Sequence, residues 1–181
     1  PHTGAMAARL EQPEDDDDEY LSMDLGFSLI NLGGEIAAPH AIAIAGWVAT
    51  HDDPQVCWSA ALTISKFDDE HAAPLASAIA ARLGDDDSDV RWQALETLGG
   101  LGKHAAPHVG AIAVRLGDDD SRVRVSAVEA LAKQGEHAAP HAGAIAQRLE
   151  DDDDEVREAS EKALSELGEH TGPHAGETVQ D

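Results

Sequence analysis

Proline recurs along this chain at a fixed interval, and this recurrence constrains the fold more than any other feature. A spacing of 33 residues separates successive members of the series Pro74, Pro107, Pro140 and Pro173. Between the units 74–106 and 107–139, 20 of 33 aligned residues are identical. Self-similarity at such a period is the signature of a repeat protein, in which each unit is one small element stacked on its neighbours.

The same series divides the whole chain. Pro39 and Pro1 extend it at slightly longer spacings, which we attribute to small insertions. The predicted units are 1–38, 39–73, 74–106, 107–139 and 140–172, with a stub at 173–181. A length of 181 residues suits one domain, so we expect a single repeat domain over residues 1–181.

Each unit predicts two helices joined by an acidic turn. The proline suits the start of the first helix, whose apolar face carries Ile and Leu at five and nine residues after it, as in Ile112 and Leu116. The second helix carries Val123, Ala127 and Leu131 at helical spacing. A glycine is expected to end each second helix: Gly102, Gly135 and Gly168. The predicted fold is all-α, a right-handed α-solenoid of about five two-helix repeats.

The second helix of each unit resembles the HEAT repeat. The run that starts at Asp85, continues Asp-Val-Arg-Trp-Gln-Ala-Leu-Glu-Thr-Leu and ends at Leu98 is similar to the short HEAT-like repeats of phycobilisome lyases. Its pattern D-x-x-V-R-x-x-A-x-x-x-L returns around Arg124 and Arg157. The resemblance implies the solenoid fold but says less of function, because such arrays serve many tasks. We predict a non-catalytic interaction scaffold or accessory subunit of a larger assembly. The alternative is a HEAT-repeat enzyme, either a metal-dependent hydroxylase or a bilin lyase, associated with a photosynthetic complex.

An aspartate and an arginine six residues apart recur in register with the repeat. The pairs are Asp85 and Arg91, Asp118 and Arg124, and Asp151 and Arg157. In HEAT-like arrays such residues form a polar ladder along the stack. A spacing that follows the repeat favours this structural role over a charged binding row. Ser22 and Cys57 occupy the arginine position in the first two units, where we expect no ladder.

Histidine pairs and aspartate runs are the candidate metal ligands. Histidines four residues apart can share one metal: His104 and His108, His137 and His141, and His170 and His174. The HEAT-like hydroxylases bind iron through His-Glu dipeptides, whereas this chain has only the reverse order. The aspartate runs contain no Asp-x-Asp-x-Asp-Gly loop that closes with a glutamate as calcium loops do. We therefore predict no native metal, no cofactor and no catalytic residue, with the aspartates capping helices.

Charge and composition exclude further classes. The chain has 12 Lys and Arg against 36 Asp and Glu, a net charge of -24, which disfavours nucleic acids and anionic membranes as partners. The longest apolar run, residues 41–49, is too short to span a bilayer, and no secretory signal is visible, so we expect a soluble, intracellular or organellar chain. The single cysteine, Cys57, excludes an intrachain disulfide and is predicted to be a buried thiol.

Aromatic residues gather in the N-terminal half. Five of the six lie between residues 20 and 67, a stretch with only five charged residues. Two outward positions of the second helices change from apolar in the first units to charged in the last. We expect a protein partner to contact the apolar members, which are Met23, Phe27, Trp58, Leu62 and Trp92. The alternative is an N-terminal cap packed on itself.

Overall fold

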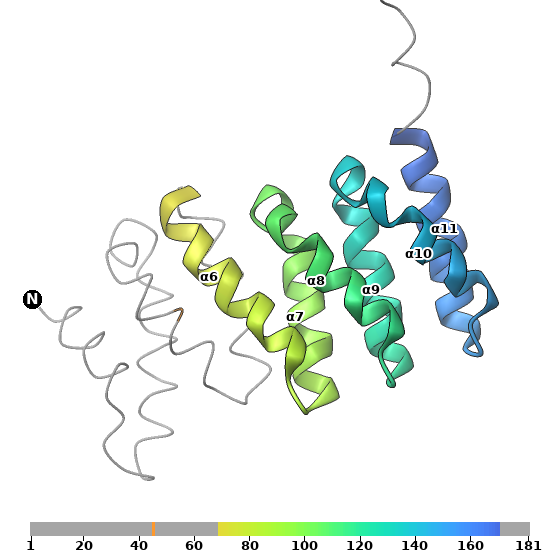
Figure 1. Ribbon diagram of the computed structural model, residues 1–181, viewed down its shortest axis with the longest axis horizontal. Helices are drawn as coiled ribbons and strands as arrows, with labels where there is room; N and C mark the ends of the chain where they lie inside the picture. The colour runs from red at the N-terminus through yellow and green to blue at the C-terminus, as the bar shows by residue number, and fades with distance from the viewer. Residues whose placement is uncertain (1–44, 46–68, 171–181) are drawn as a thin grey trace, which may run out of the picture. The chain divides into compact units, whose positions relative to one another are not determined.

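The computed structural model describes Ala45 and residues 69–170 (Figure 1). These residues are helical or lie in short turns, and none of them belongs to a strand, which confirms the predicted all-α class for this part of the chain. The chain divides into two compact units, Pro1–Ala105 and Ala106–Asp181. The described part of each unit is built from helical hairpins of the predicted kind.

The described part of the first unit is one hairpin. Helix α6 (Asp69–Ala81) tightens into the 3₁₀ turn η3 (Arg82–Gly84), and an acidic turn leads into α7 (Ser88–Gly100). A further 3₁₀ turn, η4 (Gly102–His104), follows α7. A single 3₁₀ turn at the end of an α-helix is common. In this hairpin η3 ends the first helix and leads directly into the acidic turn.

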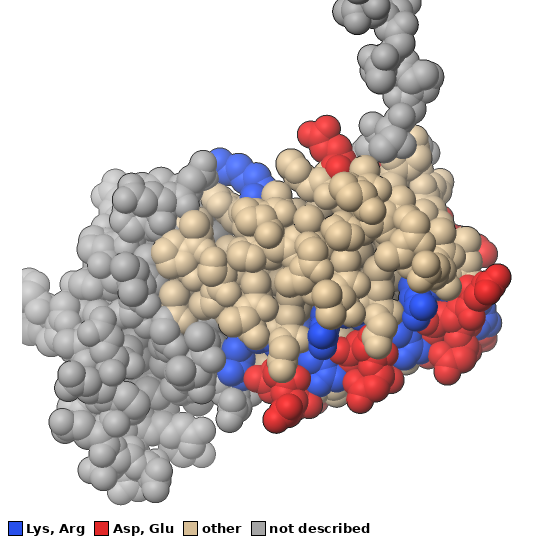
Figure 2. Space-filling view, in the orientation of Figure 1, with Lys and Arg blue, Asp and Glu red and all other residues tan. Residues whose placement is uncertain are grey.

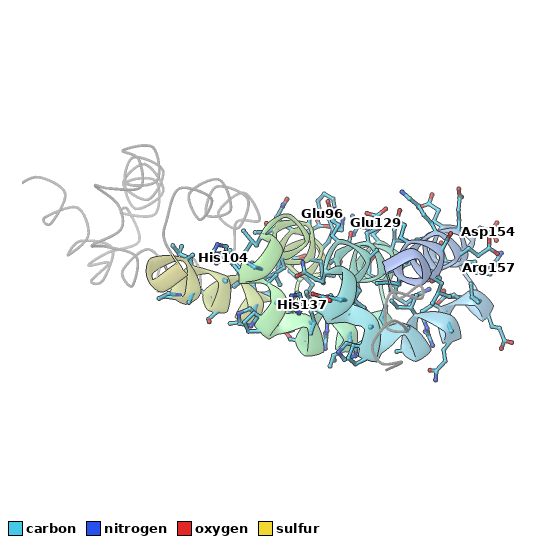
Figure 3. All side chains as sticks on the ribbon, turned by 90° about the horizontal axis from the view of Figure 1, so that it is seen from above. Glu96, His104, Glu129, His137, Asp154 and Arg157 are labelled. Atoms are coloured by element: carbon cyan, nitrogen blue, oxygen red, sulfur yellow. The ribbon has the colours of Figure 1, made fainter. Side chains whose placement is uncertain are left out.

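The described part of the second unit, residues 106–170, contains two hairpins. In chain order its elements are η5 (Ala106–His108), α8 (Val109–Val114), η6 (Arg115–Gly117), α9 (Ser121–Lys133), η7 (Gly135–His141), α10 (Ala142–Gln147), η8 (Arg148–Glu150) and α11 (Asp154–His170). Within this unit α8 and α10 form one layer and the longer α9 and α11 form the other (Figure 3). The turns that precede α9 and α11 place both helices parallel to each other. The two layers enclose the core.

The core consists of the rows that the periodicity predicts. In the first helices Ile79, Ile112 and Ile145 are fully buried, and the Val, Ala and Leu positions of α7 and α9 are buried too, as at Val123 and Leu131. In α11 the valine position is buried, but Leu164, at the leucine position, is only half-buried. The leucine row of the first helices is buried in two members, whereas Leu149 is 38% exposed. Leu149 belongs to the last described repeat, where no further described helix pair follows to cover it. Burying each such side chain stabilises the fold by about 1.5–3 kcal/mol.

The sequence predicts that a proline begins the first α-helix of each unit, but the described prolines do not lie at these positions. Pro74 lies inside α6, which begins at Asp69. Pro107 lies in η5 and Pro140 in η7, so in these repeats the α-helix begins only after the proline. A 3₁₀ segment needs no i→i−4 hydrogen bond at the proline, and it extends the first helix at its N-terminal end.

Two of the three predicted terminal glycines end their helices. Gly102 and Gly135 have φ of 53° and 55°, a left-handed conformation that other residues avoid. Each directly follows the C-cap residue of its helix, Leu101 in α7 and Gln134 in α9. The prediction for Gly168 is wrong, because this glycine lies inside α11, which continues to His170. Gly168 does not have a positive φ and therefore does not reverse the chain.

Candidate protein-interaction surface

The second helices present an outer face that the core does not use. In α7 the core positions Val90, Ala94 and Leu98 are buried, whereas Trp92, two residues past the first of them, is 36% exposed. In α9 and α11 the equivalent positions hold a half-buried Val125 and an exposed Glu158. One turn later the same face carries the half-buried Glu96 and the exposed Glu129 and Lys162. Figure 3 shows Glu96 and Glu129 pointing away from the first helices.

Trp92 is the one predicted partner-contact residue that lies within the described residues. Its indole is partly open to solvent on the outer face of α7, as the prediction requires of a contact residue. The other members of the predicted set lie outside the described residues: Met23, Phe27, Trp58 and Leu62. Their role stays a prediction from the sequence.

Within the second unit, a groove runs between the outer faces of α9 and α11. It has a volume of about 400 Å³ and is lined by Glu129, Ala132, Lys133, Ala159, Lys162, Ala163 and Glu166. Alanines form its floor because both helices place small side chains at the positions where they meet. Charged side chains of both signs line its rims. The sequence alone did not point to this groove, although its charged positions are 33 residues apart, Glu129 from Lys162 and Lys133 from Glu166.

The ladder arginines contact the acidic turns before their helices. The Nη1 atom of Arg91 donates to the carbonyl oxygens of Asp85 and Asp86, both at 2.9 Å. Arg157 makes the same kind of bond to the carbonyl oxygen of Asp151 at 2.6 Å and pairs with the carboxylate of Asp154. In each repeat the guanidinium therefore fastens the turn to the helix that follows it.

Arg124 also links two repeats of the second unit. Its Nη1 atom donates to the carbonyl oxygens of Asp118 (3.1 Å) and Asp119 (3.4 Å), and its Nη2 atom donates to Asp151 Oδ1 (2.7 Å) and Asp152 Oδ1 (2.8 Å). The side chains of Arg124 and Asp151 are 10% and 2% exposed. Such a charge-assisted bond between partly desolvated groups is stronger than one in water.

The pKa values of this junction follow from its contacts. The hydrogen bond with Asp151 raises the pKa of Arg124 above its ordinary value. Burial by itself would raise the pKa of Asp151, but its hydrogen bonds with Arg124 and with the backbone of Asp153 hold that pKa below the ordinary value. Both groups are therefore charged at neutral pH, and the pair is an ion pair.

A second arginine series, which was not among the predicted ladder residues, supports the same turns. Arg82 Nη2 pairs with Asp85 Oδ2 at 2.9 Å, and Arg115 and Arg148 repeat this pair with Asp118 and Asp151 at 3.3 and 3.4 Å. The signal was present, because each arginine precedes its aspartate by three residues and recurs every 33. The first aspartate of each turn thus has an arginine from its own first helix.

The third aspartate of each turn caps the next helix. Asp87 accepts a hydrogen bond from the backbone N–H of Asp89 at 2.8 Å, and Asp120 does the same for Arg122 at 2.9 Å. Asp153 accepts from the N–H groups of Glu155 and Val156. These contacts are those of an N-cap, which helices prefer to fill with Asp, Asn, Ser or Thr. Figure 2 shows acidic side chains beside basic ones in the second unit, at the edge where the turns before α9 and α11 lie.

Two of the predicted histidine pairs lie within the described residues, and neither is an α-helical pair; the third, His170 and His174, extends beyond the described residues. His137 and His141 both lie in η7, a 3₁₀ segment with about three residues per turn, so residues four apart point in directions about 120° apart. His104 lies in η4 and His108 in η5. Burial lowers the pKa of His108. Among the described residues, no group of three or more His, Cys, Asp and Glu side chains could hold a metal ion.

The fold and this surface define a helical-repeat protein. The family model for HEAT repeats matches residues 75–165, which is half of the chain. The chain therefore belongs to the HEAT-repeat family. The match is to HEAT repeats in general, and it does not single out the phycobilisome-lyase type of repeat.

Solved structures share the fold at low sequence identity. A structure from a study of TOG–tubulin binding specificity in microtubule dynamics and mitotic spindle formation matches with a TM-score of 0.59 and 16% identity, over 97% of this chain and 77% of the other. An engineered protein matches with a TM-score of 0.51 and 17% identity, over 93% and 89%. A designed armadillo repeat protein matches with a TM-score of 0.45 and 15% identity, over 90% and 98%.

Curated protein sequences include no match to this chain. Within the part of the chain that the structure describes, none of the helices combines the length and apolar character needed to cross a membrane.

Proposed function

We propose that the chain is a non-catalytic interaction scaffold or accessory subunit of a larger assembly, which docks a protein partner through its apolar N-terminal repeats. The observation that carries the proposal is the exposed Trp92 on the outer face of α7. The core does not need this indole, and a tryptophan on an exposed helix face is the residue type most enriched among binding hot spots.

The family supports this proposal at the level of the fold. HEAT arrays present extended rows of helices, and such surfaces are well suited to binding other proteins. The structure from the TOG–tubulin study is a protein-binding example of a similar fold. At 16% identity only the fold is shared, so the partner of this chain is proposed by its chemistry, an apolar protein surface with pockets for aromatic side chains.

We also propose the domain organisation, the role in a complex and the type of repeat. The single domain of five units over residues 1–181, the complex-subunit role and the phycobilisome-lyase type of repeat rest on the sequence pattern. For the enzyme alternative, we find no observation among the described residues that favours a hydroxylase or a lyase. The ladder pairs are proposed to be structural, since Arg91, Arg124 and Arg157 are all engaged with the acidic turns.

The experiment compares tryptophan and glutamate variants in quantitative pull-downs. We expect Trp92→Ala and Trp58→Ala to weaken partner capture, by about 2 kcal/mol or more for a hot spot, which corresponds to about 30-fold in Kd. The matched control is Glu158→Ala, which truncates the side chain at the position of α11 equivalent to Trp92 and should leave capture unchanged. Far-ultraviolet circular dichroism checks that each variant folds. Loss of capture with Glu158→Ala but not with the tryptophan variants would place the contact at the other end of the chain.

A further inference from the structure

The groove between α9 and α11 carries four charges in an alternating arrangement. Glu129 and Lys133 are one turn apart on α9, and Lys162 and Glu166 are one turn apart on α11. Because 33 residues separate Glu129 from Lys162 and Lys133 from Glu166, each acid faces a base across the groove at the same level of the two parallel helices. We call these four residues the charged quartet.

The side chains of the charged quartet form no ion pair within the described part of the chain. None of the ion pairs that the structure shows for residues 69–170 involves Glu129, Lys133, Lys162 or Glu166. Around the groove the signs run negative, positive, negative, positive. Such a pattern has no net charge, so it does not select a partner that is simply acidic or basic.

An alternating square of charges is complementary to a copy of itself. When a second identical square is turned over about a two-fold axis in the plane of the surface, every acid meets a base. A two-fold interface uses the same surface patch on both subunits. We propose that this groove is a self-association surface, and that a second copy of the chain docks on it with its α9 and α11 antiparallel to those of the first.

Repulsion between the acidic turns favours an antiparallel over a parallel arrangement of the two copies. Asp118–Asp120 and Asp151–Asp154 lie at the N-terminal ends of α9 and α11. In a parallel dimer the acidic turns of both copies would meet at the same end and repel. In an antiparallel dimer they lie at opposite ends, Glu129 meets Lys133 of the second copy, and Lys162 meets Glu166 of the second copy. The helix dipoles also favour this direction.

The net charge of -24 does not outweigh the local pattern at physiological ionic strength. Nine residues separate Glu129 from Asp120, which is about 14 Å along a helix. The Debye length is about 8 Å at 0.15 M salt, so the acidic turns are largely screened from the charged quartet. The alanine floor of Ala132, Ala159 and Ala163 leaves room for the long lysine and glutamate side chains that the second copy brings.

Sedimentation equilibrium on the full chain at 0.15 M salt tests the proposal, with concentrations up to several hundred micromolar. We expect a reversible monomer–dimer equilibrium and at least a tenfold weaker dimer for Glu129→Lys and for Lys133→Glu. Glu129→Lys changes the net charge from -24 to -22, so overall repulsion alone would strengthen association. The matched control, Glu161→Lys, makes the same change of charge at an exposed residue of α11 that does not line the groove.

The double variant Glu129→Lys/Lys133→Glu restores opposite charges in the antiparallel dimer and should associate as the wild type does. In a parallel dimer the same double variant would place like charges against Lys162 and Glu166. A monomeric wild type at all concentrations, a dimer insensitive to both single reversals, or a double variant that stays monomeric would overturn the proposal. Circular dichroism confirms that each variant is helical.

Discussion

Replacing Arg124 with methionine tests the ladder most severely, because Arg124 joins two repeats of the second unit. Methionine keeps much of the apolar stem of the side chain and removes the guanidinium. The change deletes the bonds to the carbonyl oxygens of Asp118 and Asp119 and to the carboxylates of Asp151 and Asp152. We expect a lower free energy of unfolding and an unchanged partner affinity.

The magnitude follows from burial. Removing one partner of a fully buried ion pair costs about 3–5 kcal/mol. Asp151, at 2% exposed, keeps hydrogen bonds from Arg148 at 3.4 Å and from the backbone N–H of Asp153 at 3.2 Å, which reduces this cost. Asp152 is 93% exposed, so its pair adds about 1 kcal/mol at most. A charge-assisted bond of this kind contributes about 1.5–3 kcal/mol, and we expect a loss of about 2–3 kcal/mol.

Urea denaturation followed by circular dichroism at 222 nm measures this loss. The matched control is Arg122→Met, two residues away on the same helix, whose arginine is exposed and pairs with Asp120 at 2.9 Å. We expect the control to cost less than about 1 kcal/mol. Equal costs for the two variants, or an Arg124→Met protein that unfolds like the wild type but fails to capture its partner, would refute the structural role of the ladder.

Three further predictions concern the second unit. The side-chain amide oxygen and nitrogen of Gln134 are buried without a hydrogen-bond partner, and the equivalent residues of the neighbouring repeats are Leu101 and Leu167. We therefore expect Gln134→Leu to raise the free energy of unfolding by about 1 kcal/mol in urea denaturation, and a lower free energy of unfolding would contradict this. Gly135→Ala, at a φ of 55°, should cost about 1–2 kcal/mol, whereas Gly168→Ala, inside α11 with open space around its Cβ, should gain up to about 1 kcal/mol; the opposite order of melting temperatures would be incompatible with these helix ends. Because the pKa of Asp151 is lowered in the folded state, its stabilising contribution is present above its ordinary pKa of 3.8 and is lost as the pH falls through the lower pKa of the folded state. The loss of unfolding free energy caused by Arg124→Met should therefore shrink in acid titrations below pH 3.8. A loss that stays constant down to pH 2 would exclude this ion pair.

Most of the fold could be predicted because the repeat displays its own core. The Ile, Val, Ala and Leu rows follow from helical spacing, and Ile112 and Leu131 are buried as that spacing requires. Periodicity fails where the helix type changes. The 3₁₀ geometry of η7 depends on how the chain turns at Gly135, and it separates His137 and His141 although their spacing is that of an α-helical pair.

The candidate surface could be predicted only in part. The outward position of Trp92 follows from counting along α7, because the buried faces of the helix are fixed by Val90 and Ala94. The groove does not follow from one helix, since it needs the approach of α9 to α11 and small residues on both. Burial also could not be predicted for Leu149 and Glu161. Both are exposed, whereas the equivalent residues one repeat earlier, Leu116 and Val128, are buried. The difference arises because burial in a repeat array depends on the next repeat.

Hydrogen exchange of the chain, free and bound to its captured partner, tests the central proposal most directly. We expect slower exchange on binding in Ser88–Gly100, around Trp92, and in residues 20–67, with unchanged exchange in the acidic turns Asp118–Asp120 and Asp151–Asp154. Protection confined to α11 or to the acidic turns, with none in Ser88–Gly100, would contradict docking through the apolar N-terminal repeats.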